Sequence, residues 1–151
     1  MGRGSLRRSI FQRLFGIPAT KLPRDPGSWR YAGGELVVEL ARVPELGGAG
    51  GGVRFEGRGL PRRVLVVRAE DGSYRAFHNR CRHFGRRLDP LPGGACIQCS
   101  SVSKATYDLS GTVVSGPARG PLETYPVEVR EGKLVVRLGE TAPQRSSRQG
   151  G

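Results

Sequence analysis

A Cys-x-His pair and a distant cysteine constrain the fold of this chain more than any other feature. Cys81 and His83 stand on one short segment, and Cys99 follows His83 after fifteen intervening residues. A thiolate and an imidazole this close together form half of a cage for a tetrahedral metal ion or an iron–sulfur cluster. A second loop that carries Cys99 would complete the cage. The chain must therefore fold so that two loops meet.

Further motifs lie on both sides of these residues in a fixed order. Residues 78–88 read His-Asn-Arg-Cys-Arg-His-Phe-Gly-Arg-Arg-Leu, and residues 106–108 read Thr-Tyr-Asp. Gly111, Ser-Gly-Pro-Ala at 115–118 and Leu-Glu-Thr-Tyr-Pro-Val at 122–127 follow. In this order the motifs resemble those of Rieske [2Fe–2S] proteins, and the resemblance spans about residues 35–138. In a Rieske centre two cysteines hold one iron and two histidines hold the other.

The chain departs from the family pattern at the second loop. Three residues after Cys99, where the second ligand histidine should stand, the sequence has Val102, whose side chain cannot coordinate iron. An additional cysteine, Cys96, precedes Cys99 with the spacing Cys-x2-Cys, which is typical of a backbone turn around a metal. The resemblance makes Cys81, His83 and Cys99 ligands, and only the fourth ligand is contested, with Cys96 as the preferred candidate.

Two arrangements of the ligands remain open. The first takes all three cysteines and one histidine as a Cys3His set, which suits Zn²⁺ or a [2Fe–2S] cluster. The second keeps the family alignment, in which Cys81 and Cys99 bind one iron and His83 binds the other. Either Cys96 or a serine oxygen then supplies the missing ligand of the iron that His83 binds. The candidate serines are Ser100, Ser101 and Ser103. The structural alternatives are that Cys96 is simply a core residue and that the site is inherited but empty.

Strand signals at short intervals predict an all-β domain. Short segments of valine, leucine and aromatic residues, several of them alternating with charged residues, occur at 36–40, 53–55, 64–68, 74–77, 127–130 and 134–138. Asp71-Gly72 and Glu131-Gly132 provide tight hairpin turns between neighbouring runs. Such a pattern favours a sandwich or barrel. The resemblance adds a small rubredoxin-like subdomain, made of two cluster-binding loops, at about residues 78–108.

The predicted domain, residues 35–138, lies between two tails. Residues 1–34 combine a basic amphipathic segment with a linker at 21–34 rich in proline and glycine, and residues 139–151 are predicted to be disordered. Apolar residues at helical spacing within 5–15 suggest contact with a membrane surface or a partner. The Arg-Arg pair at 7–8 is not followed by the apolar region of a twin-arginine signal, so we expect a cytoplasmic protein.

The chain is strongly basic, with 25 lysines and arginines against 13 aspartates and glutamates. We expect no nucleic acid as partner, because the arginines are scattered and no nucleic-acid-binding motif accompanies them. Some arginines do gather near the first predicted loop, where they could steer an acidic redox partner. These are Arg80, Arg82, Arg86 and Arg87.

Together these features predict a one-electron carrier with a [2Fe–2S] cluster and an unidentified redox partner. Rieske oxygenases also need a mononuclear iron held by two more histidines and a carboxylate, but the chain has only His78 and His83. We therefore expect an electron carrier, or the electron-transfer component of an oxidoreductase, rather than a catalytic enzyme. The alternative is a non-redox structural or interaction module whose Cys3His site holds Zn²⁺ or nothing.

Overall fold

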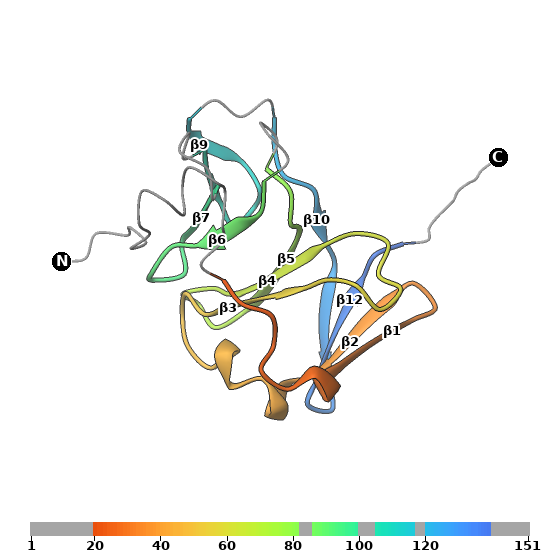
Figure 1. Cartoon of the computed structure of the whole chain (residues 1–151). Coiled ribbons are helices and arrows are strands. Elements are labelled where there is room, and N and C mark those ends of the chain that lie inside the picture. The colour runs from red at the N-terminus through yellow and green to blue at the C-terminus, as the bar shows by residue number, and fades with distance from the viewer. Residues whose placement is uncertain (1–19, 82–85, 100–104, 117–119, 140–151) are drawn as a thin grey trace.

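A computed structural model describes residues 20–81, 86–99, 105–116 and 120–139 of the chain. These residues form twelve strands and three 3-10 turns, and the strands pair antiparallel in three four-stranded sheets (Figure 1). The 3-10 turns are η1 (Pro26–Ser28), η2 (Leu40–Arg42) and η3 (Pro44–Leu46). The prediction of an all-β fold is confirmed.

Each sheet combines segments from different parts of the chain. Sheet A has the order β1 (Trp29–Ala32), β2 (Glu35–Glu39), β12 (Lys133–Arg137), β11 (Val127–Arg130). Sheet B has the order β10 (Thr124–Tyr125), β5 (Tyr74–His78), β4 (Val64–Arg68), β3 (Gly52–Phe55). Sheet C has the order β6 (Leu88–Pro90), β7 (Cys96–Cys99), β8 (Thr106–Asp108), β9 (Val113–Ser115). Sheet C thus contains both predicted ligand cysteines of the second loop.

Sheet B is covered on both faces and separates two cores. In its central strand β4, Val64 and Val66 belong to the core shared with sheet A, whereas Leu65 and Val67 belong to the core shared with sheet C. Successive side chains of a strand point to opposite faces. A continuous apolar run is therefore what a strand buried on both faces requires, and all four side chains are fully buried.

The segment before residue 35 differs from the predicted linker. Residues 29–32 form β1, which pairs with β2 so that Trp29 lies opposite Val38. Trp29 is buried and meets the ring of Phe55 edge to face at 5.5 Å. The glycines that suggested a linker form the hairpin turn instead, because Gly33 and Gly34 both have positive φ. The chain therefore joins the sandwich well before residue 35.

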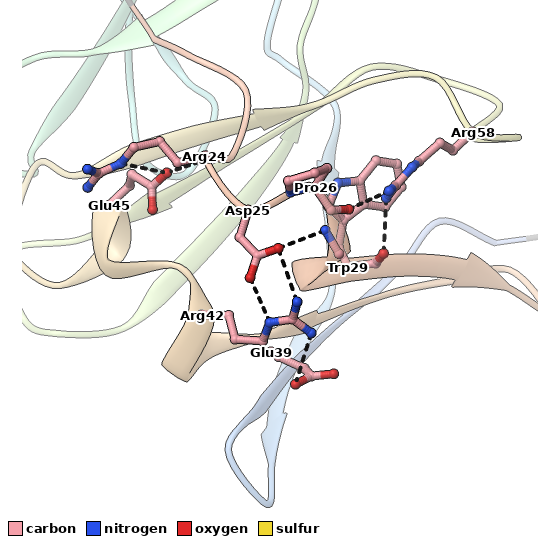
Figure 2. A network of polar contacts seen from close by, with 9 residues as sticks. Arg24, Asp25, Pro26, Trp29, Glu39, Arg42, Glu45 and Arg58 are labelled. Carbon is pink, nitrogen blue, oxygen red and sulfur yellow. Dashed lines mark hydrogen bonds and ion pairs between the residues drawn. The ribbon is translucent and has the colours of Figure 1, made fainter.

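A polar network fastens this N-terminal segment to the sandwich (Figure 2). The Asp25 carboxylate accepts the Gly27 N–H at 2.9 Å, which caps η1, and it accepts two hydrogen bonds from Arg42 at 2.7 and 3.1 Å. The Arg58 guanidinium lies 4.6 Å from the centre of the Trp29 ring and donates to the Trp29 carbonyl. Exposed ion pairs contribute little to stability, so we assign this network a positioning role.

Two glycines allow a close backbone approach between the loops of sheets B and C. Gly94 has a φ of +78°, and a Cβ there would lie 2.7 Å from the Glu70 nitrogen. Gly50 also has positive φ, and its Cβ would lie 2.8 Å from the Gly93 nitrogen. Only glycine lets backbones approach this closely. The glycine run at 47–52 is thus packed, through Gly50, against the turn that precedes β7.

Several predictions lie outside the described residues. Among these are the amphipathic segment 5–15 and the tail beyond residue 139, so both stay predictions. Within the described ranges, no helix is long and apolar enough to cross a bilayer. At the start of these ranges, the Thr20 N–H donates to the buried Asp89 carboxylate at 2.7 Å. The first described residue, Thr20, therefore lies beside β6.

Candidate metal centre

Two predicted ligands, Cys81 and Cys99, share one buried core. Cys81 follows β5, Cys99 ends β7, and neither is exposed to solvent. Both belong to the cluster of buried side chains between sheets B and C. Leu88 lies opposite Cys99 in the β6–β7 pairing, and its N–H donates to the Asn79 side chain at 2.7 Å. This bond joins the segment that leads into Cys81 to the strand beside Cys99.

Each of these cysteines also marks the start of a segment whose ends are bonded together. The Cys81 N–H donates to the Arg86 carbonyl at 2.7 Å, and the Cys99 N–H donates to the Ala105 carbonyl at 2.8 Å. The intervening residues, 82–85 and 100–104, lie outside the described part of the chain. The predicted ligand His83 and the candidate serines of the second loop are among them, so their assignment stays a prediction.

A tyrosine hydroxyl lies beside one of the buried thiols. The hydroxyl of Tyr107, in β8, is 3.5 Å from the Cys81 sulfur, and Tyr107 is fully buried. When Cys81 is a thiolate, the hydroxyl donates and the sulfur accepts. The sequence marked Tyr107 only as part of a Tyr-Asp motif. Its contact with Cys81 arises from the packing of sheet C, so no pattern in the neighbouring sequence predicts it.

Cys96 does not lie on the same face as Cys99. The four residues 96–99 form strand β7 rather than the backbone turn that the Cys-x2-Cys spacing predicted. Side chains three positions apart in a strand point to opposite faces, and Cys96 is only partly buried where Cys99 is fully buried. Burial raises the pKa of the Cys96 thiol, as do the carboxylates of Asp108 and Glu70. A protonated thiol is a poor metal ligand. Both the direction of the side chain and the raised pKa therefore argue against Cys96 as the fourth ligand.

The described residues hold no complete metal site by themselves. Among them, no group of three or more histidine, cysteine, aspartate or glutamate side chains is arranged to bind a metal ion. All three cysteines, including Cys96, are free of disulfide bonds. A Cys3His zinc set would need Cys96 on the side of Cys99, and strand β7 puts it on the other side.

Five arginines that interact electrostatically with one another or with His78 lie near the start of the first loop. We call them the arginine face, which consists of Arg54, Arg62, Arg63, Arg80 and Arg87. Two glutamates offset part of its charge: Glu56 pairs with Arg87 at 2.6 Å, and Glu123 pairs with Arg62 at 2.5 Å. Burial, and then the charge of Arg87, lower the pKa of Arg63. Burial would raise the pKa of Glu56, but hydrogen bonds from Arg87 and Arg54 outweigh it and lower the pKa.

The second histidine of the chain lies within this arginine face. His78, at the end of β5, lines a hollow of about 270 Å³ together with Arg62, Arg80 and Glu123. Its ring nitrogen Nδ1 is 3.6 Å from the Glu123 carboxylate. Burial and the neighbouring Arg62 charge lower the pKa of His78, so the imidazole is neutral at pH 7. The positive charge here therefore comes from arginine alone.

Comparison with known proteins relates the chain to two kinds of protein. It is 34% identical over 94 residues to the biphenyl 2,3-dioxygenase subunit alpha of Rhodococcus jostii, covering 53% of this chain and 20% of that protein. It is 29% identical over 72 residues to the 3-phenylpropionate/cinnamic acid dioxygenase ferredoxin subunit of Photorhabdus laumondii, covering 46% of this chain and 69% of the relative. The chain thus spans a fifth of the larger relative and most of the ferredoxin.

A solved structure agrees with these sequence matches. The ferredoxin of carbazole 1,9a-dioxygenase from Nocardioides aromaticivorans has a TM-score of 0.51 and 26% identity, over 60% of this chain and 88% of that one. Residues 37–126, more than half of the chain, match the family described as Rieske [2Fe-2S] domain. Together with the antiparallel three-sheet fold and the two thiols buried in one core, this match shows that the chain belongs to the Rieske [2Fe–2S] domain family.

Proposed function

We propose that this protein carries single electrons through a [2Fe–2S] cluster held by Cys81, His83 and Cys99. The observation that carries the proposal is the burial of Cys81 and Cys99 in one core, each at the start of a segment closed by a backbone hydrogen bond. When bound, the cluster takes up and releases one electron. The surrounding strands keep the sulfur atoms in place and exclude water from them.

The donor set in the described core fits such a cluster. Two cysteine thiols in an apolar core, neither of them in a disulfide, are the protein ligands that one iron of a Rieske centre takes. A buried amide nitrogen of Asn79 has no hydrogen-bond partner among the described residues, and sulfur would supply an acceptor for it. The other iron keeps His83 but has Val102 in place of its second histidine. Because Cys96 faces away, we propose that the fourth ligand is a serine oxygen from residues 100–103.

Metal and sulfide analysis after anaerobic expression tests the proposal directly. We expect about two irons and two sulfides per chain, together with visible absorbance and an EPR signal after reduction. A colourless protein with stoichiometric zinc would contradict it and support the structural module instead. The module is not favoured, because the family match is to an iron–sulfur domain and Cys96 is not placed to complete a Cys3His set.

We further propose that the redox partner is acidic. The relatives named as ferredoxins belong by name to dioxygenase systems, and by analogy this chain serves a partner enzyme. Five arginines against two glutamates leave the arginine face with excess positive charge beside the first loop. Such a charge steers oppositely charged molecules and is screened by salt. An acidic surface is therefore the partner chemistry that this face favours.

Small charged oxidants test the sign of this field without a known partner. Arg80 is exposed, and Arg80→Glu should slow oxidation of the reduced protein by anionic ferricyanide and accelerate oxidation by cationic tris(phenanthroline)cobalt(III). Both effects should shrink as ionic strength rises. Stopped-flow absorbance measures the rates. The matched control is Arg30→Glu on β1, which makes the same charge change in sheet A. Equal effects of the two variants would contradict a steering role for the arginine face.

The Tyr107 hydroxyl should raise the midpoint potential of the cluster. A hydrogen bond to a ligand sulfur favours the more negative reduced state, so Tyr107→Phe should lower the potential. A hydrogen bond of about 1 kcal/mol corresponds to about 40 mV for one electron. Protein-film voltammetry measures the shift, and Tyr31→Phe in sheet A is the control. A midpoint that stays at the wild-type value in Tyr107→Phe would show that the hydroxyl does not donate to Cys81.

A further inference from the structure

Asn79 is a buried amide of which only one half has a partner. The residue is fully buried, and its Oδ1 accepts the Leu88 N–H at 2.7 Å. Its backbone is satisfied as well, because its N–H donates to the Arg63 carbonyl at 2.8 Å and its carbonyl accepts from the Arg63 side chain at 3.1 Å. Only Nδ2 remains, and it has no hydrogen-bond partner among the described residues.

An orphaned donor of this kind is costly in a protein interior. Leaving a buried N–H without an acceptor costs about 1–3 kcal/mol, and native structures contain few such groups. Oδ1 alone would satisfy the Leu88 N–H, so that contact does not explain why the amide nitrogen is present. A second acceptor at this place would explain it.

The position of Asn79 indicates which acceptor that is. Asn79 precedes Cys81 by two residues, and it bonds to Leu88, which lies opposite Cys99 in the β6–β7 pairing. The amide therefore lies close to Cys81 in the sequence and bonds to the strand partner of Cys99. Among the clustered buried side chains between sheets B and C, the polar atoms are these two sulfurs and the Tyr107 hydroxyl. The buried Asp89 carboxylate of β6 already accepts the Thr20 N–H. Sulfur is the acceptor that this surrounding offers.

We propose that Asn79 is a positioning residue of the cluster site, whose Nδ2 donates a hydrogen bond to sulfur when the cluster is bound. Oδ1 holds the end of the first loop through Leu88, while Nδ2 stabilises negative charge on sulfur. Each N–H···S bond favours the reduced state and raises the potential. This inference rests on the proposed function, because it requires a bound cluster.

Isotope labelling tests the contact in the unmodified protein. Asn79 is the single asparagine of the chain, so cell-free synthesis with asparagine labelled with ¹⁵N at the side-chain amide marks one atom only. After anaerobic reconstitution with iron and sulfide and reduction, pulsed EPR should detect a ¹⁵N coupling to the cluster. Iron and sulfide analysis precedes the measurement. A protein with a full cluster but no ¹⁵N coupling would overturn this inference and leave the proposed function intact. A protein without iron and sulfide would overturn both.

Two variants distinguish the effect of the lost Nδ2 donor on the midpoint potential from the effect of a changed charge at Asn79. Asn79→Asp keeps the oxygen that Leu88 needs and loses the donor, whereas Asn79→Leu loses both without adding charge. We expect both to have a midpoint below that of the wild type, in the same direction as Tyr107→Phe. A lowered midpoint in Asn79→Asp with a wild-type value in Asn79→Leu would reveal a pure charge effect and overturn the inference. If neither variant folds, the labelling experiment on the wild type still decides.

Discussion

Cys99→Ala should lose the [2Fe–2S] cluster entirely, whereas Cys96→Ala should keep the iron and sulfide content of the wild type. Cys99 is fully buried in the same core as Cys81, and a methyl group cannot replace a thiolate on iron. The two substitutions remove the same atom from the same strand, three residues apart. Iron and acid-labile sulfide analysis after anaerobic purification, with EPR of the reduced protein, measures the result.

The comparison also decides between the two ligand arrangements that the sequence left open. Circular dichroism of both apoproteins checks that each variant folds, since loss of one buried sulfur should leave the sheets intact. If Cys96→Ala also loses its cluster, β7 must rearrange on binding so that both cysteines reach the metal. That result would contradict the alternation of faces in β7 and restore the Cys3His set.

The strands that could be predicted are those whose own side chains specify them. The run 64–68 was predicted with the bounds that β4 has, because four successive buried apolar residues are enough to mark a strand. The hairpin from β4 to β5 was clear for a second reason, since Asp71-Gly72 forms its turn and Gly72 has positive φ. Local sequence and tertiary structure agree in these places.

Sheet C could not be predicted in the same way. Strand β6 is Leu-Asp-Pro, and β8 and β9 also have only three residues each, too few to show alternation. Asp and Pro are unfavourable in strands, and β6 is a strand because it pairs with β7. The N-terminal strand β1 was missed for a similar reason, since flanking prolines and glycines concealed it.

The residues of the candidate site also fall into those that the sequence predicted and those that depend on tertiary packing. Cys81 and Cys99 followed from the family resemblance, and the structure places both in one core. The Cys-x2-Cys spacing of Cys96 suits either a turn or a strand, and only the pairing of β7 with β6 and β8 makes it a strand. The polar neighbours Asn79 and Tyr107 stood in the motifs without a role, because hydrogen bonds across sheets leave no local pattern.

Gly94→Ala should destabilise the apoprotein by about 4 kcal/mol, since two costs add up. Gly94 has a φ of +78°, which strains any residue with a Cβ, and its Cβ would lie within 3.0 Å of backbone atoms in Arg68, Ala69 and Glu70. Backbone cannot move aside as a flexible side chain can. Urea unfolding of the apoprotein measures the free energy of unfolding.

The neighbouring Gly93→Ala is the matched control. Gly93 also has positive φ, at +97°, but its Cβ would meet no atom within 4 Å, so only the strain of about 1–2 kcal/mol remains. Equal losses in the two variants would show that the approach of the β6–β7 turn to the end of β4 is not close. Because that approach packs sheet C against sheet B and so encloses the core of Cys81 and Cys99, Gly94→Ala should also lower cluster content more than Gly93→Ala.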